Sequence, residues 1–439
     1  MTVEKPNIVY IHSHDTGRFV QPYGHPVPTP RIQQFAEEGV LFRRAYCAGP
    51  TCSPSRACLL TGTYAHTNGM HGLTHRDFAH RLKDYSWHIT HPLRDAGYIS
   101  ALAGVQHIHQ ITDEAYRWIG YDMSIGGRGD GHNGAAEFLA QPHDKPFFLS
   151  VGFAETHRVF PEDHPGDDSR YTMPPPYFPD TPECREDFAR FKASARRLDA
   201  KVGTVLDAID ANGLRDNTLV ILTTDHGIAF PRMKCNLTDG GIGVMLMLRG
   251  PSGFSGGKVI DALVSHIDLF PTICALAGAT PPDHLQGMSL LPLVNGEQSI
   301  RDEIHAEVNF HGSYQPTRCV RTDRFKYIRR FYDHGFYPSC DAGSTLSFWL
   351  ENCAWDDLPL ESEMLYDCLL DPNEAHNLLE NPAYQTTLMD MRKRLGRWMT
   401  ETDDPILRGT IPRPEGGGVY KPNCVSSKNQ SRIDAIEFP

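Results

Sequence analysis

The most informative stretch of the chain is Cys52-Ser53-Pro54-Ser55-Arg56-Ala57-Cys58-Leu59-Leu60-Thr61-Gly62. Proline is favoured in the first turn of a helix, where its missing N–H would have no partner anyway. Pro54 therefore places Cys52 at a helix N-terminus, where free backbone N–H groups and the helix dipole attract an anion. Arg56, one turn later, adds a fixed cation. The stretch predicts an anion-binding site around Cys52.

Three short apolar runs around this stretch predict buried strands of an α/β protein, at residues 8–11, 146–153 and 218–224. Polar side chains directly follow each run, in the sequences His12-Ser13-His14-Asp15, Glu155-Thr156-His157 and Asp225-His226. Ligand sites in open α/β sheets lie beyond the carboxyl ends of the strands. We therefore expect these imidazoles and carboxylates to meet at one edge of a sheet.

Helical spacing of apolar residues from about residue 185 up to Asn212-Gly213 predicts a long crossover helix. Further helices are expected near residues 31–38 and 82–95, with a strand at 98–102. This alternation of strands and helices predicts an α/β fold with a central sheet flanked by helices.

After about residue 310 the pattern changes. A strand-like segment at 319–331, a Pro/Gly/Cys-rich stretch at 337–344 and a final helix near 384–400 predict a smaller α+β subdomain. We therefore divide the chain into a catalytic α/β domain, residues 1–310, and a C-terminal subdomain, residues 311–439. The second part is expected to hold a small antiparallel sheet, a helix and a tail that wraps the surface.

Length and charge exclude several classes of protein. With 439 residues, the chain can bury a large core without disulfide or metal support. The formal net charge of -12 argues against a nucleic-acid binder, because the chain has no surplus of Lys and Arg to neutralise phosphates. It contains no apolar run of about 18 residues, so no membrane span is expected. A local cluster of basic side chains can still hold an anionic substrate.

Cysteine usage and the N-terminal sequence predict a cytoplasmic protein. The 11 cysteines are an odd number without a regular spacing, which indicates mostly reduced thiols. The segment before residue 8 is short and polar, which leaves no room for the apolar part of a signal peptide. The sequence leaves a homo-oligomer open.

The Cys-x-Pro-x-Arg pattern at Cys52 and the Leu-Thr-Gly that ends the stretch resemble the signature of the sulfatase family. The resemblance implies that a formylglycine-generating enzyme oxidises Cys52 to an aldehyde, which hydrates to a geminal diol. One diol oxygen then attacks sulfur. Deprotonation of the other expels sulfate, a step for which a plain Ser or Cys lacks the second hydroxyl.

The resemblance extends along almost the whole chain and is strongest to the heparan N-sulfatase (sulfamidase) branch. The stretches that carry it are His66 to Leu73, Pro175 to Pro182, Asp225 to Pro231, and the C-terminal Leu365-Tyr366-Asp367, Asp371-Pro372-Asn373-Glu374 and Asn377-Leu378. It implies the fold of the alkaline phosphatase superfamily, with a mixed central sheet.

The resemblance also implies a divalent metal site. The paired N-terminal aspartates of the family fall on His14 and Asp15, and its later Asp-Asn pair falls on Asp225 and His226, with Cys52 beside them. Sulfatases usually hold Ca²⁺ through oxygen ligands, which makes Ca²⁺ the expected metal. The two imidazoles keep Mn²⁺ open, because nitrogen ligands suit transition metals better.

The Gly-Lys-x-His element of the family aligns with Gly104-Val105-Gln106-His107, so the histidine is present and the lysine is missing. His109 is one candidate for the missing cation. The resemblance assigns His107 to the diol, His157 to the leaving group, and Lys234, together with Arg56, to the sulfate. The other histidines between His71 and His91 leave a pocket-lining and a structural role open.

These features predict a sulfatase that hydrolyses a sulfate monoester or sulfamate of a small molecule or oligosaccharide. One alternative is a phosphonate or phosphate mono- or diester hydrolase of the same superfamily, which the Asp225-His226 pair favours. The other alternative is an anion-binding relative without turnover, in which Cys52 stays unmodified.

Overall fold

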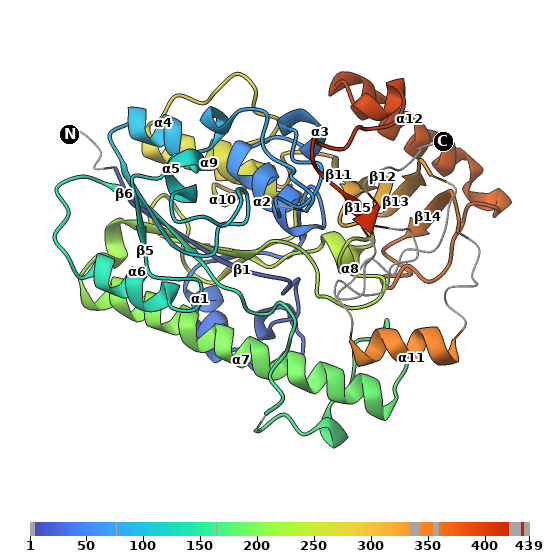
Figure 1. The fold of residues 1–439 in the computed structure, drawn as a ribbon, viewed down its shortest axis with the longest axis horizontal. Coiled ribbons are helices and arrows are strands. Elements are labelled where there is room, and N and C mark those ends of the chain that lie inside the picture. Colours follow the sequence, from blue (N-terminus) through green and yellow to red (C-terminus); the bar gives the residue numbers. More distant parts are fainter. Residues whose placement is uncertain are drawn as a thin grey trace.

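The computed structural model describes residues 5–75, 77–163, 165–332, 343–353, 360–420 and 432–433. A mixed eight-stranded sheet forms its centre (Figure 1). In their order across the sheet, the strands are β5 (Met123–Ile125), β4 (Ile99–Gly104), β6 (Phe147–Gly152), β1 (Asn7–Ser13), β7 (Thr218–Thr224), β8 (Leu246–Arg249), β2 (Val40–Phe42) and β9 (Lys258–Ile260).

The strands from β5 to β7 run parallel, whereas β8 is antiparallel to both of its neighbours. The central strand β1 pairs with β6 on one side and β7 on the other, so that Ile11 lies opposite both Val151 and Leu222. The carboxyl ends of β4, β6, β1 and β7 therefore lie at one edge of the sheet, as the sequence predicts.

Helices cover both faces of this sheet (Figure 1). Alternate strand residues point to opposite faces, so Tyr10 and Ile221 pack on one side while Val9 and Leu222 pack on the other. The first face is covered by α2 (Cys52–Thr61), α4 (Thr90–Asp95), α5 (Ala115–Ile119), α9 (Leu269–Ala277) and α10 (Leu291–Val294). The second is covered by α1 (Pro30–Glu38), α6 (Gly131–Leu139) and α7 (Pro182–Ala211).

The three predicted strands at the centre of the sheet are confirmed as β1, β6 and β7, and the predicted crossover helix as α7. Helix α7 begins earlier than predicted, because Thr181 caps it by accepting a hydrogen bond from the Cys184 N–H. The single helix predicted at 82–95 is wrong. Asp84 caps a short 3-10 turn at Tyr85–Trp87, and extended backbone at His88 separates this turn from α4.

The C-terminal part contains a four-stranded antiparallel sheet. Its strands are β11 (Glu303–Phe310), β12 (Tyr314–Thr322), β13 (Phe325–Arg330) and β14 (Glu363–Asp367). Helix α12 (Gln385–Glu401) packs on this sheet through Leu388, Met391 and Leu395. Strand β11 lies before the subdomain boundary at residue 310, so the division of the chain at that residue stays a prediction.

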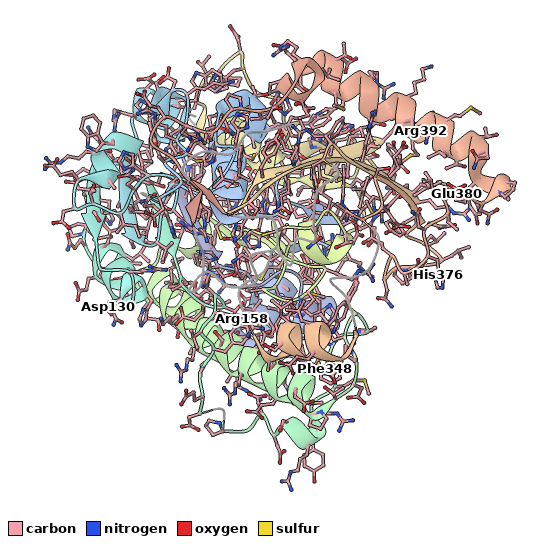
Figure 2. The ribbon with its side chains drawn as sticks, turned by 45° about the vertical axis from the view of Figure 1, so that its right-hand side comes forward. Asp130, Arg158, Phe348, His376, Glu380 and Arg392 are labelled. Atoms are coloured by element: carbon pink, nitrogen blue, oxygen red, sulfur yellow. The ribbon has the colours of Figure 1, made fainter. Side chains whose placement is uncertain are left out.

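Helix α11 (Ser344–Asn352) connects the C-terminal part to the long helix α7, and Figure 2 shows it through the label on Phe348. Asp187 on α7 accepts hydrogen bonds from Thr345 and from the guanidinium of Arg158. Through Asp187, the segment after β6 and helix α11 are therefore both bonded to α7.

The remaining described elements are short: β3 (Ala45–Tyr46), β10 (Val264–Ser265), β15 (Val419–Tyr420), β16 (Arg432–Ile433), α3 (Ala65–Asn68) and α8 (Asp239–Ile242). Most of the predicted Pro/Gly/Cys-rich stretch at 337–344 and of the tail lies outside the described residues. Within the described segments, no helix has the length and apolar character needed to cross a membrane.

Candidate active site

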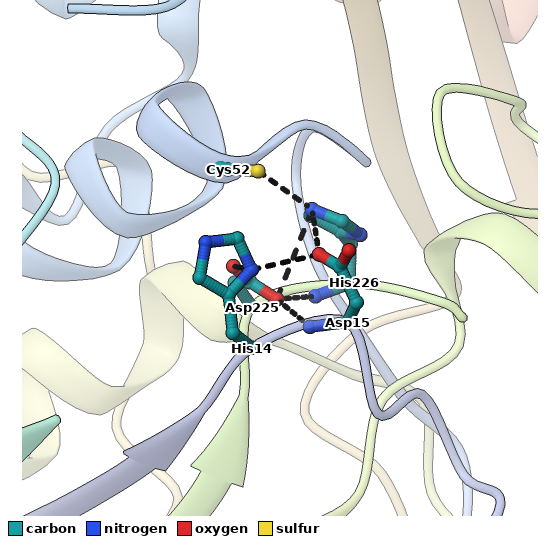
Figure 3. A group of neighbouring side chains, drawn as sticks. All are labelled: His14, Asp15, Cys52, Asp225 and His226. Carbon is teal, nitrogen blue, oxygen red and sulfur yellow. Dashed lines mark hydrogen bonds and ion pairs between the residues drawn. The ribbon is translucent and has the colours of Figure 1, made fainter. Parts of the chain in front are cut away.

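Five buried side chains form a cluster at the carboxyl edge of the central sheet (Figure 3). His14 and Asp15 follow β1, Asp225 and His226 follow β7, and Cys52 is the first residue of α2. One candidate ligand atom from each of the five lies within 4.8 Å of the others. These are the residues that the sequence assigns to a metal site, and the fold brings all of them together.

The carboxylate of Asp225 is held from several sides. Its Oδ1 accepts hydrogen bonds from the backbone N–H groups of Asp15, at 2.8 Å, and His226, at 2.9 Å. Its Oδ2 lies 3.0 Å from a guanidinium nitrogen of Arg56 and 3.1 Å from Nδ1 of His14. Because each oxygen is fixed by two partners, Asp225 has one defined orientation in the cluster.

Asp15 lies between a lysine and two imidazoles. Its Oδ2 is 2.8 Å from Nζ of Lys234, and its Oδ1 is 2.7 Å from Nδ1 of His14 and 3.3 Å from Nε2 of His226. The backbone of Asp15 has a φ of 55°, a left-handed conformation that is uncommon outside glycine. Such conformations cluster at functional sites, where the surrounding contacts hold the strain.

The surroundings keep both carboxyls ionised and one imidazole neutral. Burial, the largest single effect, raises the pKa of both acids. At Asp15 it is outweighed by Lys234 together with the nearby imidazoles, and at Asp225 by the nearby imidazoles together with Arg56. The pKa of each acid therefore lies well below its usual range. Burial lowers the pKa of His14 to about 4, so a ring nitrogen of His14 keeps a lone pair at neutral pH.

Arg56 projects from the first turns of α2 into the same cluster. Besides Asp225, it donates to the backbone carbonyl of Ser13 at 2.9 Å and contacts Nδ1 of the buried His12. The sequence prediction includes no role for His12. The alternation of β1 is a signal for one, because His12 shares a strand face with Tyr10, which packs towards α2.

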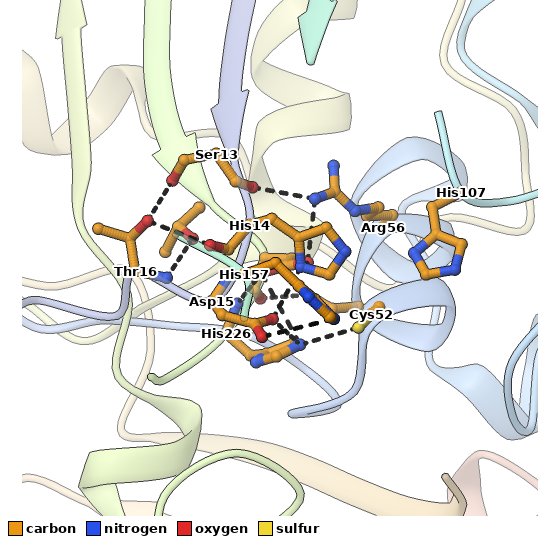
Figure 4. Close-up of polar contacts among 12 residues, drawn as sticks. Ser13, His14, Asp15, Thr16, Cys52, Arg56, His107, His157 and His226 are labelled. Carbon is orange, nitrogen blue, oxygen red and sulfur yellow. Dashed lines mark hydrogen bonds and ion pairs between the residues drawn. The ribbon is translucent and has the colours of Figure 1, made fainter. Parts of the chain in front are cut away.

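His157 and His107 flank the cluster (Figure 4). The ring centre of His157 lies 4.6 Å from that of His14, and its Nε2 lies 3.9 Å from Oδ2 of Asp15. The ring centre of His107 lies 5.5 Å from that of His14. His107 also has a left-handed backbone, with a φ of 60°, and burial lowers its pKa well below the usual range.

His75 belongs to the histidine-rich stretch for which the sequence leaves a pocket-lining and a structural role open. Its Nε2 lies 2.9 Å from Nε2 of His107, so one of the two imidazoles donates a hydrogen bond to the other. His109, the candidate for the missing cation, lies elsewhere. Its ring packs against Tyr85, with ring centres 5.4 Å apart, and its Nδ1 contacts the carbonyl of Gln110.

The cluster suits a divalent cation. Protein ligands bind such ions at roughly 2.0–2.6 Å, so ligands on opposite sides of an ion lie about 4–5 Å apart. The five candidate atoms satisfy this spacing, and two of them belong to ionised carboxylates. A mixture of carboxylate and imidazole ligands is compatible with Ca²⁺ and favours Mn²⁺ or other transition metals.

The chain matches the sulfatase family model over residues 6–279, which is more than half of its length. The chain belongs to the sulfatase family. A second match, over residues 233–342, is to the C-terminal region of N-sulphoglucosamine sulphohydrolase. Membership in this family makes the protein a sulfuric ester hydrolase.

Individual sulfatases are similar over most of their length. Human N-sulphoglucosamine sulphohydrolase is 30% identical over 447 residues, covering 86% of each chain. An ulvan-active sulfatase of Formosa agariphila is 26% identical over 466 residues, covering 91% of this chain and 76% of its own. The solved structure of a 2-O GAG sulfatase has the same fold, with a TM-score of 0.72, 21% identity and coverage of 94% and 95% of the two chains.

The sequence resemblance indicates three departures from the family pattern in this site. Histidines stand at positions 14 and 226, and both lie inside the cluster. At the third place, the buried Val105 replaces the family lysine. The nearest cations that the structure places in the cluster are therefore Arg56 and Lys234, each paired with one carboxylate.

Proposed function

We propose that this sulfatase removes sulfate from a sulfated saccharide, as an ester or a sulfamate, through a formylglycine formed from Cys52. The position of Cys52 carries the proposal. It opens α2 beside four candidate metal ligands, with its Sγ 3.4 Å from Nε2 of His226. The N-terminus of a helix favours an anion, and here it faces the point where the nucleophile would meet the sulfate.

His14, Asp15, Asp225 and His226 would hold one divalent cation, together with an oxygen of residue 52 in its modified form. When bound, the cation polarises a sulfuryl oxygen and lowers the pKa of a bound hydroxyl. We favour Ca²⁺ from the family resemblance, with Mn²⁺ as the alternative that the two imidazoles support.

The cationic side chains around the cluster bind the sulfate, and the histidines transfer protons. Arg56 and Lys234 bind the sulfate oxygens and keep the paired carboxylates ionised. His107 takes or returns the proton of the nucleophile. His157, whose side chain is 28% exposed and reaches solvent, donates a proton to the leaving group. A saccharide hydroxyl is a poor leaving group, so this proton transfer has a direct effect on the rate.

The relatives support a saccharide as the substrate. One has N-sulphoglucosamine in its name, and others are ulvan-active sulfatases. A chain with the same fold was solved in complex with its substrate, D-glucosamine-2-N,6-O-disulfate, with a TM-score of 0.67 and 18% identity. D-glucosamine-2-N,6-O-disulfate carries sulfate on nitrogen as well as on oxygen, so the proposal includes both bonds.

We also propose that the protein works in the cytoplasm, on a small or short substrate. Buried cysteines such as Cys47, Cys58 and Cys274 are unpaired thiols, which suits a reducing compartment. Fractionation of cells that express a tagged chain tests this point, and recovery from the periplasm or medium contradicts it.

The test of the proposed function begins with the mass of the peptide that contains Cys52, since conversion to formylglycine removes the sulfur. The modified protein is then assayed with matched aryl sulfate and aryl phosphonate esters, in Ca²⁺ and Mn²⁺ separately, before a panel of N- and O-sulfated sugars. Faster sulfate turnover that disappears in Cys52→Ala supports the proposal. Faster phosphonate turnover overturns it.

A further inference from the structure

A pocket of about 460 Å³ lies at the carboxyl ends of β4 and β5, next to the active site. It shares His107 with the site, and His75, the hydrogen-bond partner of His107, forms part of the same wall. Ligand pockets have volumes of roughly 300–1,000 Å³, so this one has room for a sugar unit with its substituents. A molecule in the pocket would lie directly beside the group proposed to handle the nucleophile's proton.

Val105 lines this pocket at the position where the family has a lysine. A lysine carries its charge on a long flexible stem, whereas valine ends in two methyl groups close to the backbone. The substitution therefore removes a cation from this wall and leaves an apolar surface in its place. Leu102, Ile111 and Ala115 extend the apolar surface.

Arg128 supplies a cation to the pocket from a different segment, the loop between β5 and α6. Its charge acts on His75, because burial and then Arg128 lower the pKa of that imidazole. The other polar groups of the wall include Asp113 and Tyr116, whose phenol accepts a hydrogen bond from Arg117 at 2.9 Å. The wall thus combines an aromatic ring, a carboxylate and a guanidinium.

We propose that this pocket binds a sugar unit of the substrate beside the active site, and that Arg128 selects a saccharide bearing a second anionic group. The second group is a carboxylate or another sulfate, both of which a guanidinium recognises through paired hydrogen bonds. Tyr116 packs against the sugar ring, and Asp113 accepts hydrogen bonds from its hydroxyls. The inference rests on the proposed function, since it names what the same active site would cleave.

The test compares wild type with Arg128→Ala on three matched sulfated disaccharides: one with a uronate, one with a second sulfate and one with neither. A charged hydrogen bond contributes about 1.5–3 kcal/mol. Accordingly, the variant should lower kcat/KM on the doubly anionic substrates about 10- to 100-fold more than on the singly sulfated one. Loss on only one of the two doubly anionic substrates identifies the anion that is recognised.

Arg43→Ala is the matched control. Arg43 is an exposed arginine, its Nε lies 3.1 Å from Asp261, and it does not line the pocket. It should leave the substrate preference unchanged. Equal effects of Arg128→Ala on all three disaccharides, or equal effects of the two variants, overturn the pocket assignment. A wild-type protein with formylglycine and metal that cleaves neither an aryl sulfate nor any sulfated sugar of the panel overturns the proposed function itself.

Discussion

Lys234→Met tests whether a buried lysine balances the charge of the cluster. The substitution keeps an unbranched side chain and removes only the ammonium group, which lies 2.8 Å from Oδ2 of Asp15 with both side chains at most 1% exposed. At an effective dielectric constant of about 20, two opposite charges at this distance attract by roughly 6 kcal/mol. Desolvation offsets part of this attraction. Leaving a buried carboxylate unpaired typically costs about 3–5 kcal/mol.

We therefore expect the metal-free Lys234→Met protein to lose about 3–5 kcal/mol of unfolding free energy in urea titrations. Excess Mn²⁺ or Ca²⁺ should restore part of this loss, because a divalent cation then pairs with Asp15. In the metal-loaded enzyme, the loss of one charge that stabilises the transition state should lower kcat about 10²- to 10³-fold.

Lys201→Met is the control for removal of a lysine charge from a salt bridge. Its Nζ lies 2.6 Å from Glu155, but the two side chains are 22% and 17% exposed, so water screens the pair. The expected loss is at most about 1 kcal/mol. Equal losses for the two variants, or a Lys234→Met protein with wild-type stability and activity, would refute the charge-pairing argument.

Three further predictions concern single groups. Cys52→Ala should lower sulfatase activity by about 10³-fold or more without preventing metal binding, as measured by turnover and calorimetry. His75→Ala should lower kcat about 10- to 100-fold, with a smaller loss on aryl sulfates than on sugar sulfates and a shifted pH–rate profile, because His107 loses its partner. Burial lowers the pKa of His88 and His266 to about 3, so the unfolded chain binds more protons below the usual histidine pKa of about 6.5. Stability should fall as pH decreases from about 6.5 towards 3, and urea midpoints at pH 7.5 and 5.5 measure this effect.

The sequence is sufficient to bring the five side chains of the cluster to one place, for a physical reason. Each of its residues directly follows a buried strand or opens a helix, so the backbone position alone determines where the side chain lies. The apolar runs of β1, β6 and β7 specify three adjacent parallel strands, and the polar residues after them share one edge. Of the five residues, only Cys52 does not follow a strand of the sheet, and Pro54 predicts its position at the N-terminus of a helix.

The loops were harder to predict, because their contacts join distant parts of the chain. His75 and His107 belong to segments without a regular period, and only the folded structure brings their Nε2 atoms to 2.9 Å. His109 is predicted as a candidate for the missing cation of the site, but the structure places it away from the cluster. It lies two residues after His107, but the turn made by Gln106, which accepts from the N–H groups of Ile108 and His109, directs this segment away from the cluster.

The charge of the site also bears on the choice between sulfate and phosphate esters. Asp15 and Asp225 carry two negative charges, which Arg56 and Lys234 balance, and imidazoles that bind a metal are neutral. A divalent cation then leaves the site with two positive charges. A sulfate monoester or sulfamate carries one negative charge, and an ionised nucleophile supplies the other, so that the loaded site is neutral. A phosphate monoester dianion would leave an excess negative charge in a buried cluster, which is costly. The charge balance of the loaded site therefore favours substrates with a single negative charge, which include sulfate esters and sulfamates.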